Sequence, residues 1–180
     1  MLDTVEQLYA PRFTQPEVLR AAELKAATLQ TWANRGLVQP ANPSPGTGQR
    51  RRYSAVQVFK LRLMQTLATF GVSVARAAGI ADEVSGKCGA GPIPFDSFTV
   101  IEPPRDNDVV QTHAAAGGYE GDPWEIRLAH ILRRSANPNK FNESATGDPY
   151  GGTDAALVIH TGRVYRDVMA ELKAILSDEQ

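Results

Sequence analysis

The stretch FTQPEVLRAAELKAATLQTWANRGLVQP, residues 13–40, decides the fold of the N-terminal part of this chain. Thr14 is suited to cap a first helix, because Glu17 stands three residues after it. A second helix is predicted over residues 26–35, and Gly36 follows it where a helix end often needs a positive φ. The two predicted helices are joined by about three residues, which is the arrangement of a helix-turn-helix.

A wing is predicted directly after the helix pair. Residues 38–40 leave the second helix in an extended form, and residues 41–48 (ANPSPGTG) hold two prolines and two glycines, which indicates a loop. Residues 49–53 (QRRRY) then return as a second extended segment. Together these segments predict a small hairpin beside the helices.

Two further helices are predicted after the wing. Ser54 caps the first, over residues 55–70, whose apolar side chains recur on one face, and Gly71 ends it. The second, over residues 72–84, is rich in alanine. Residues 12–84 are therefore expected to form one winged helix-turn-helix domain.

The sequence changes in character after this domain. Residues 85–94 (SGKCGAGPIP) are predicted as a flexible linker, because they hold three glycines and two prolines. Residues 95–180 are predicted as a small C-terminal region of α/β type, whose topology the sequence does not define. Within it we expect two strands, a long loop and a final helix, at residues 95–101, 155–160, 135–153 and 165–176. The predicted class of the whole chain is α+β.

Charge is distributed unevenly along the chain, although the net charge is only −1. Residues 10–62 hold nine basic and two acidic residues, a net charge of +7, whereas residues 63–180 hold ten basic and sixteen acidic residues, a net charge of −6. This pattern is expected where one part of a protein contacts phosphates and the other does not. The alternative is chance clustering on a solvated surface.

Several classes of protein are not supported by the sequence. Cys88 is the only cysteine, so a disulfide framework and a multi-cysteine zinc site are excluded, and no metal is predicted. No apolar run approaches the roughly 18–20 residues that span a membrane, and residues 1–13 lack the character of a signal peptide, so we expect a cytoplasmic protein. No phosphate-binding glycine loop or nucleophile elbow is present, so neither an enzyme nor a cofactor is predicted.

Three further patterns refine the fold: TLQTWANRGLVQP at residues 28–40, RRYS at residues 51–54 and GVS at residues 71–73. With the order of strand, helix-turn-helix, wing and paired helices, they resemble the DNA-binding domain of the MerR family of transcription regulators over residues 12–84. The sequence departs from the family where Lys25 replaces the usual Ser or Thr, and where Ala27 replaces a common Arg.

The resemblance implies a sequence-specific transcriptional regulator that binds double-stranded DNA as a dimer at an inverted repeat. The second helix would read bases in the major groove, while the wing arginines would contact phosphates or the minor groove. The alternative is that the helix residues are ordinary polar side chains on an exposed face. The candidate DNA-binding residues are Lys25, Thr28, Gln30, Thr31, Asn34, Arg35, Arg50, Arg51, Arg52 and Tyr53.

Two other functions use the same winged fold: an architectural DNA-binding protein of the excisionase or phage recombination type, and a protein-interaction adaptor. We expect a homodimer joined through residues 155–176, where Val168, Leu172 and Ile175 form an apolar stripe. The alternative is that this stripe packs inside the C-terminal domain of its own chain. The sequence does not define an operator, a small-molecule effector or the direction of regulation.

Overall fold

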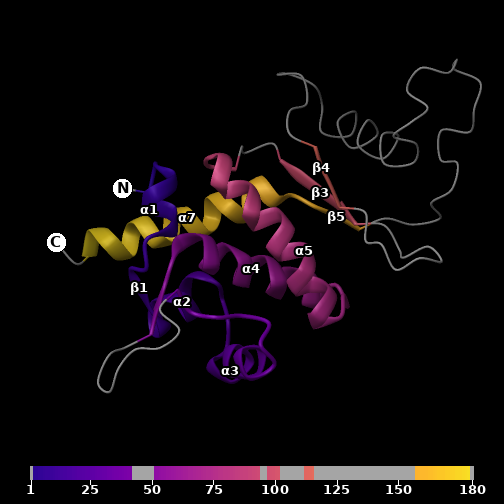
Figure 1. Cartoon of the computed structure of the whole chain (residues 1–180), viewed down its shortest axis with the longest axis horizontal. Helices are drawn as coiled ribbons and strands as arrows, with labels where there is room; N and C mark the ends of the chain where they lie inside the picture. Colours follow the sequence, from indigo (N-terminus) through magenta and orange to yellow (C-terminus); the bar gives the residue numbers. More distant parts are fainter. Residues whose placement is uncertain (1, 42–50, 94–96, 102–111, 116–156, 179–180) are drawn as a thin grey trace, which may run out of the picture. The chain divides into compact units, whose positions relative to one another are not determined.

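The computed structural model describes residues 2–41, 51–93, 97–101, 112–115 and 157–178 (Figure 1). The chain divides into two compact units. Unit 1 comprises Met1–Ile93 together with Arg163–Gln180, and unit 2 comprises Pro94–Gly162. The described residues are mostly helical with small antiparallel sheets, so the predicted α+β class is confirmed.

Unit 1 is built from helices and one two-stranded sheet. In chain order its elements are α1 (Val5–Tyr9), β1 (Phe13–Thr14), α2 (Gln15–Ala21), α3 (Ala26–Asn34), β2 (Arg52–Tyr53), α4 (Ala55–Thr69), α5 (Val74–Gly86), the 3-10 helix η1 (Lys87–Ala90) and, from Arg163 onward, α7 (Thr161–Asp178).

The predicted helix-turn-helix is formed by α2 and α3. The capping box at the start of α2 is present, since the Glu17 carboxylate accepts the backbone N–H of Thr14 at 2.6 Å. The turn after α2 passes through Glu23, whose φ is 51°, an uncommon value for a residue other than glycine. Gly36 follows α3 with a φ of 70°, as predicted for the residue after the helix.

Helix α4 forms the centre of unit 1. Ser54 caps it as predicted. Eight of its residues are buried, and three of them, Phe59, Met64 and Leu67, are completely inaccessible to solvent. Burial of one apolar side chain of this size contributes about 1.5–3 kcal/mol to the free energy of unfolding. Because α4 is buried around most of its circumference, it holds the neighbouring helices of the unit together (Figure 1).

The prediction of a linker from residue 85 is wrong for its first half. Helix α5 continues to Gly86, and η1 extends the helical path to Ala90. Val84 and Cys88 stand four residues apart, and both are buried, at 2% and 0% exposure. Burial of these two side chains keeps the segment helical despite its glycines.

The final helix, predicted over residues 165–176, is present as α7. The prediction that it belongs to a separate C-terminal region is wrong. Its residues from Arg163 onward belong to unit 1, and the Tyr165 ring meets the Phe59 ring of α4 edge-on, with centroids 5.3 Å apart. Val168, Leu172 and Ile175 are 1%, 0% and 5% exposed within their own chain. The expected dimer contact through this stripe is therefore not supported, because the stripe is already covered.

Unit 2 contains a three-stranded antiparallel sheet of order β4-β3-β5. Strands β3 (Phe98–Ile101) and β5 (Leu157–Ile159) fall within the strands predicted at residues 95–101 and 155–160, whereas β4 (Thr112–Ala115) was not predicted. The loop predicted near residues 135–153 lies outside the described residues. In the described part of the chain, no helix combines the length and apolar character needed to cross a membrane.

Candidate nucleic-acid interface

Helix α3 presents a polar surface opposite its buried side. Leu29 and Trp32 face the core at 2% and 4% exposure. On the exposed side, the Gln30 side chain donates through Nε2 to Asn34 Oδ1 at 2.7 Å, and Thr31 Oγ1 donates to the backbone carbonyl of residue 27 at 2.8 Å. The bond between the two amides leaves the Gln30 oxygen and the Asn34 amino group able to bind other groups.

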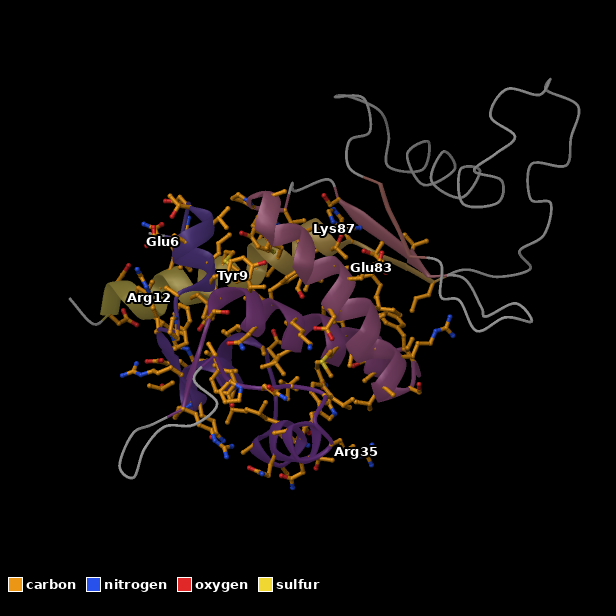
Figure 2. The ribbon with its side chains drawn as sticks, viewed as in Figure 1. Glu6, Tyr9, Arg12, Arg35, Glu83 and Lys87 are labelled. Atoms are coloured by element: carbon orange, nitrogen blue, oxygen red, sulfur yellow. The ribbon has the colours of Figure 1, made fainter. Side chains whose placement is uncertain are left out.

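The remaining candidates on and beside α3 are placed mostly as the sequence suggested. Lys25 precedes the helix and Arg35 follows it, and both are exposed, while Thr28 is half-buried. Figure 2 shows Arg35 at the end of α3. Figure 1 shows α3 on one side of α4 and α7 on the other, so α7 does not cover the polar surface of α3.

Residues 42–50 of the predicted wing lie outside the described residues, and its base is described in β2, which pairs with β1 and also accepts a hydrogen bond from Ala41 of the segment after α3. Phe13 lies opposite Tyr53 and Thr14 opposite Arg52 in this antiparallel pair. The Arg52 guanidinium donates through Nη1 to the carbonyl of Arg12 at 2.6 Å, and Arg12 N–H donates to the Tyr53 carbonyl at 3.0 Å. The wing arginine and Arg12 are therefore held side by side at this sheet.

The three wing arginines and Tyr53 do not share one environment. Arg51 and Arg52 are exposed, and Arg50 lies outside the described residues. Tyr53 is only 3% exposed, and burial raises the pKa of its phenol, with Arg51 acting in the opposite direction. The structure thus places Tyr53 in the core, apart from the exposed arginines.

The ion pairs show which of the basic residues between positions 10 and 62 are already neutralised. Arg20 binds Glu171 at 2.6 Å, and Lys60 and Arg62 pair with Asp82 and Glu23. Within the described residues, the exposed cations of this segment that have no ion pair are Arg12, Lys25, Arg35, Arg51 and Arg52. The positive charge that remains available is thus found at both ends of α3 and at the β1–β2 sheet.

The family comparison agrees with this arrangement. Residues 13–84 match the family model described as MerR HTH family regulatory protein. The N-terminal domain is a MerR-type helix-turn-helix domain. The match covers less than half of the chain and ends in α5, so it classifies this domain alone. No curated protein sequence matches the chain.

Arg12 is a further candidate DNA-binding residue of the MerR-type domain, and it was not among the residues predicted from the sequence. Its charge was counted in the basic segment, but its place became clear only from the register of β1 and β2. The sequence signal was a cation directly before an apolar–polar pair at residues 13–14. Arg12 is exposed and adjoins Arg52, so it belongs with the wing arginines as a candidate phosphate contact.

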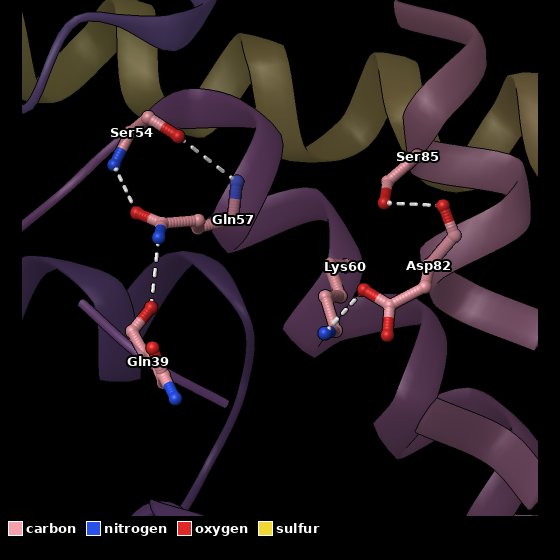
Figure 3. A network of polar contacts seen from close by, with 6 residues as sticks. All are labelled: Gln39, Ser54, Gln57, Lys60, Asp82 and Ser85. Carbon is pink, nitrogen blue, oxygen red and sulfur yellow. Dashed lines mark hydrogen bonds and ion pairs between the residues drawn. The ribbon is translucent and has the colours of Figure 1, made fainter. Parts of the chain in front are cut away.

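A network of polar contacts joins α4 of the MerR-type domain to the segment after α3 and to α5 (Figure 3). Gln57 links the start of α4 to the carbonyl of Gln39, while Lys60 of α4 pairs with Asp82 of α5. These side chains border a cavity of about 450 Å³. Gln57, Lys60 and Asp82 are already engaged in these contacts, so the cavity walls do not single out one ligand chemistry.

Proposed function

We propose that this protein is a sequence-specific transcriptional regulator that binds double-stranded DNA as a dimer at an inverted repeat. The observation that carries the proposal is the polar face of α3, which has unpaired cations at both ends and lies in a MerR-type domain. Regulators of this family bind DNA, and exposed Lys and Arg provide affinity because they displace counterions from phosphates.

The two parts of the surface have different tasks in this proposal. Helix α3 enters the major groove, where amide side chains such as Gln30 and Asn34 can pair with adenine. Arg51 and Arg52 contact the phosphate backbone beside it. The bond from Arg52 to the Arg12 carbonyl occupies one of five guanidinium N–H groups, so the others remain able to bind a phosphate.

The test is the double variant Arg51→Ala and Arg52→Ala. We expect it to weaken binding to specific and random duplex DNA alike, and to reduce the slope of log affinity against log salt by about one to two. The matched control is Arg163→Ala with Arg166→Ala, which removes the same charge from α7. The measurement is fluorescence anisotropy with labelled duplexes at several salt concentrations.

Two results would count against the proposal. Binding by the double variant that equals the wild type at every salt concentration would contradict the assignment of the wing. A wild-type chain that binds no duplex even at low salt would favour a protein-interaction role for the winged fold.

A further inference from the structure

Gln57 is hydrogen-bonded at both ends of its carboxamide group (Figure 3). Its Oε1 accepts the backbone N–H of Ser54 at 2.8 Å, and its Nε2 donates to the backbone carbonyl of Gln39 at 2.7 Å. The first bond completes the capping box of α4, in which Ser54 Oγ accepts the N–H of Gln57 at 3.2 Å. The second bond crosses to the segment that leaves α3, and capping a helix does not require it.

A carboxylate at position 57 would cap α4 equally well. Glu and Gln both serve at the third residue of a capping box, because each offers an oxygen to the N–H of the cap residue. Only an amide also carries N–H donors, since an ionised carboxylate accepts but does not donate. The amide of Gln57 therefore makes a contact, to Gln39, that α4 itself does not need.

The bond to Gln39 holds one of the two segments at the wing base. Two residues further along, Ala41 N–H donates to the carbonyl of Arg52 at 3.0 Å. Arg52 lies in β2, which is fixed by its pairing with β1. The segment that returns from the wing is thus anchored on β1, and the segment that enters the wing is anchored on α4 through Gln57.

We propose that Gln57 is a positioning residue, which sets the orientation of the wing arginines relative to α3 for simultaneous contact with one DNA duplex. This role rests on the proposed DNA-binding function. Without the bond to Gln39, the segment that follows α3 keeps its Ala41 bond to Arg52 but loses its hydrogen bond to α4, so α3 can shift relative to β2, which stays fixed on β1. Arg51 and Arg52 then lose a fixed distance from α3, and part of the binding energy is used to restore it.

The test compares Gln57→Glu with Gln39→Glu in the full chain. Both variants add one negative charge, on one or the other of the two residues that this hydrogen bond joins, so general repulsion from DNA is closely matched. Gln57→Glu keeps the oxygen that caps α4 and loses the donor, whereas Gln39→Glu alters an exposed side chain and keeps the accepting carbonyl. A third variant, Ser54→Ala, removes the hydroxyl of the cap and leaves the bond between Gln57 and Gln39.

Three quantities are measured: thermal unfolding, affinity for a duplex selected by the wild-type protein, and hydrogen exchange at the Ala41 amide. We expect Gln57→Glu to bind DNA about three- to tenfold more weakly than Gln39→Glu, as the loss of one hydrogen bond predicts. Its unfolding temperature should fall by no more than the few degrees that one hydrogen bond accounts for, while exchange at Ala41 becomes faster. Ser54→Ala should unfold at a lower temperature and, while folded, bind DNA as the wild type does.

Equal DNA affinities of the two Glu variants would overturn this role of Gln57, because charge alone would then account for the loss. That outcome leaves the proposed function intact, since the wild type still binds. A wild-type chain that binds no duplex at low salt would instead refute the proposed function and this role together.

Discussion

At the scale of single residues, Gln30 and Asn34 act on the surface of α3 as a pair. The bond of 2.7 Å between them fixes both amides, so removal of either side chain changes the orientation of the other. We expect Gln30→Ala and Asn34→Ala each to alter the DNA sequence that the protein prefers, because a direct base contact contributes about 1–3 kcal/mol. Since the two residues are in contact, the effects of the two substitutions should not be additive.

Selection from random oligonucleotides, followed by a double-mutant cycle on the selected duplex, checks this prediction. Ser177→Ala, on the exposed end of α7, is the control that should leave the preferred sequence unchanged. If both α3 variants select the wild-type sequence, these amides do not read bases.

Tyr165 gives a prediction about stability and pH. Its hydroxyl is buried and has no hydrogen-bond partner among the described residues. Burial, with smaller contributions from Cys88 and Asp3, raises the pKa of Tyr165 from 10.0 to about 12. The folded chain thus holds this proton more tightly than the unfolded chain, so the free energy of unfolding falls as the pH rises from 10.0 toward 12.

Tyr165→Phe should remove that part of the alkaline loss and raise the free energy of unfolding at neutral pH by about 1 kcal/mol, because an unsatisfied hydroxyl is no longer buried. Urea unfolding at about pH 7 and about pH 11 measures both effects. Some alkaline loss should persist, since burial also raises the pKa of Cys88 to about 11. A variant that is less stable than the wild type at both pH values would show that the hydroxyl has a partner.

At the scale of elements, α7 is part of the unit that contains the helix-turn-helix. Leu172 is fully buried, and ion pairs in the same turn of α7 join Glu171 to Arg20 and Lys173 to Asp3. We expect Leu172→Ala to lower the free energy of unfolding of unit 1 by about 2–5 kcal/mol, as cavities in a packed core do. The exposed neighbour provides the control, because Lys173→Ala should cost no more than about 1 kcal/mol.

Denaturant unfolding followed by the fluorescence of Trp32, which lies in α3, measures this effect in the correct unit when the other tryptophan of the chain is removed by Trp124→Phe in every variant. If Leu172→Ala left the unfolding of that tryptophan unchanged, α7 would not support the MerR-type domain.

The elements that sequence predicted well are those with local signals. Thr14 and Glu17 marked the start of α2, and Ser54 marked the start of α4, because a cap and the residue three places later are read directly. Helix α1 carries the same signal in Thr4 and Gln7, but its five residues are too few to show an apolar period. Strand β4 (THAA) has no alternation that distinguishes it from a loop.

The features that sequence did not predict depend on contacts between distant residues. The period of α7 identified a helix with an apolar face, but a period does not say what covers that face. In the candidate site, the exposed residues of α3 followed from the helical period. The contact between Arg52 and Arg12 followed from the register of β1 and β2, which no local pattern encodes.

At the scale of the whole molecule, unit 1 is assembled from two separate parts of the chain. The chain leaves it at Ile93 and returns at Arg163, so residues 94–162 are inserted into the unit that carries α3. A truncated chain that ends near residue 85 would lose α7 together with the inserted segment. Such a truncation would unfold the domain rather than test dimerisation, so the assembly must be measured on the full chain.

We expect the full chain to bind an inverted repeat as a dimer. One helix-turn-helix with a wing makes few phosphate contacts, and two copies on half-sites about one helical turn apart gain affinity because the second contact is intramolecular. The full chain should therefore bind an inverted repeat at least about 10²-fold more tightly than a single half-site. A duplex in which the half-sites are moved apart by about five base pairs should lose this gain, because the second half-site then faces the opposite side of the DNA.

Light scattering of the free protein and of the complex gives the number of chains directly. The stripe of Val168, Leu172 and Ile175 is buried in its own chain, so the contact between copies must use other residues. One chain per duplex, or equal affinity for the half-site and the repeat, would show that the protein acts on DNA as a monomer.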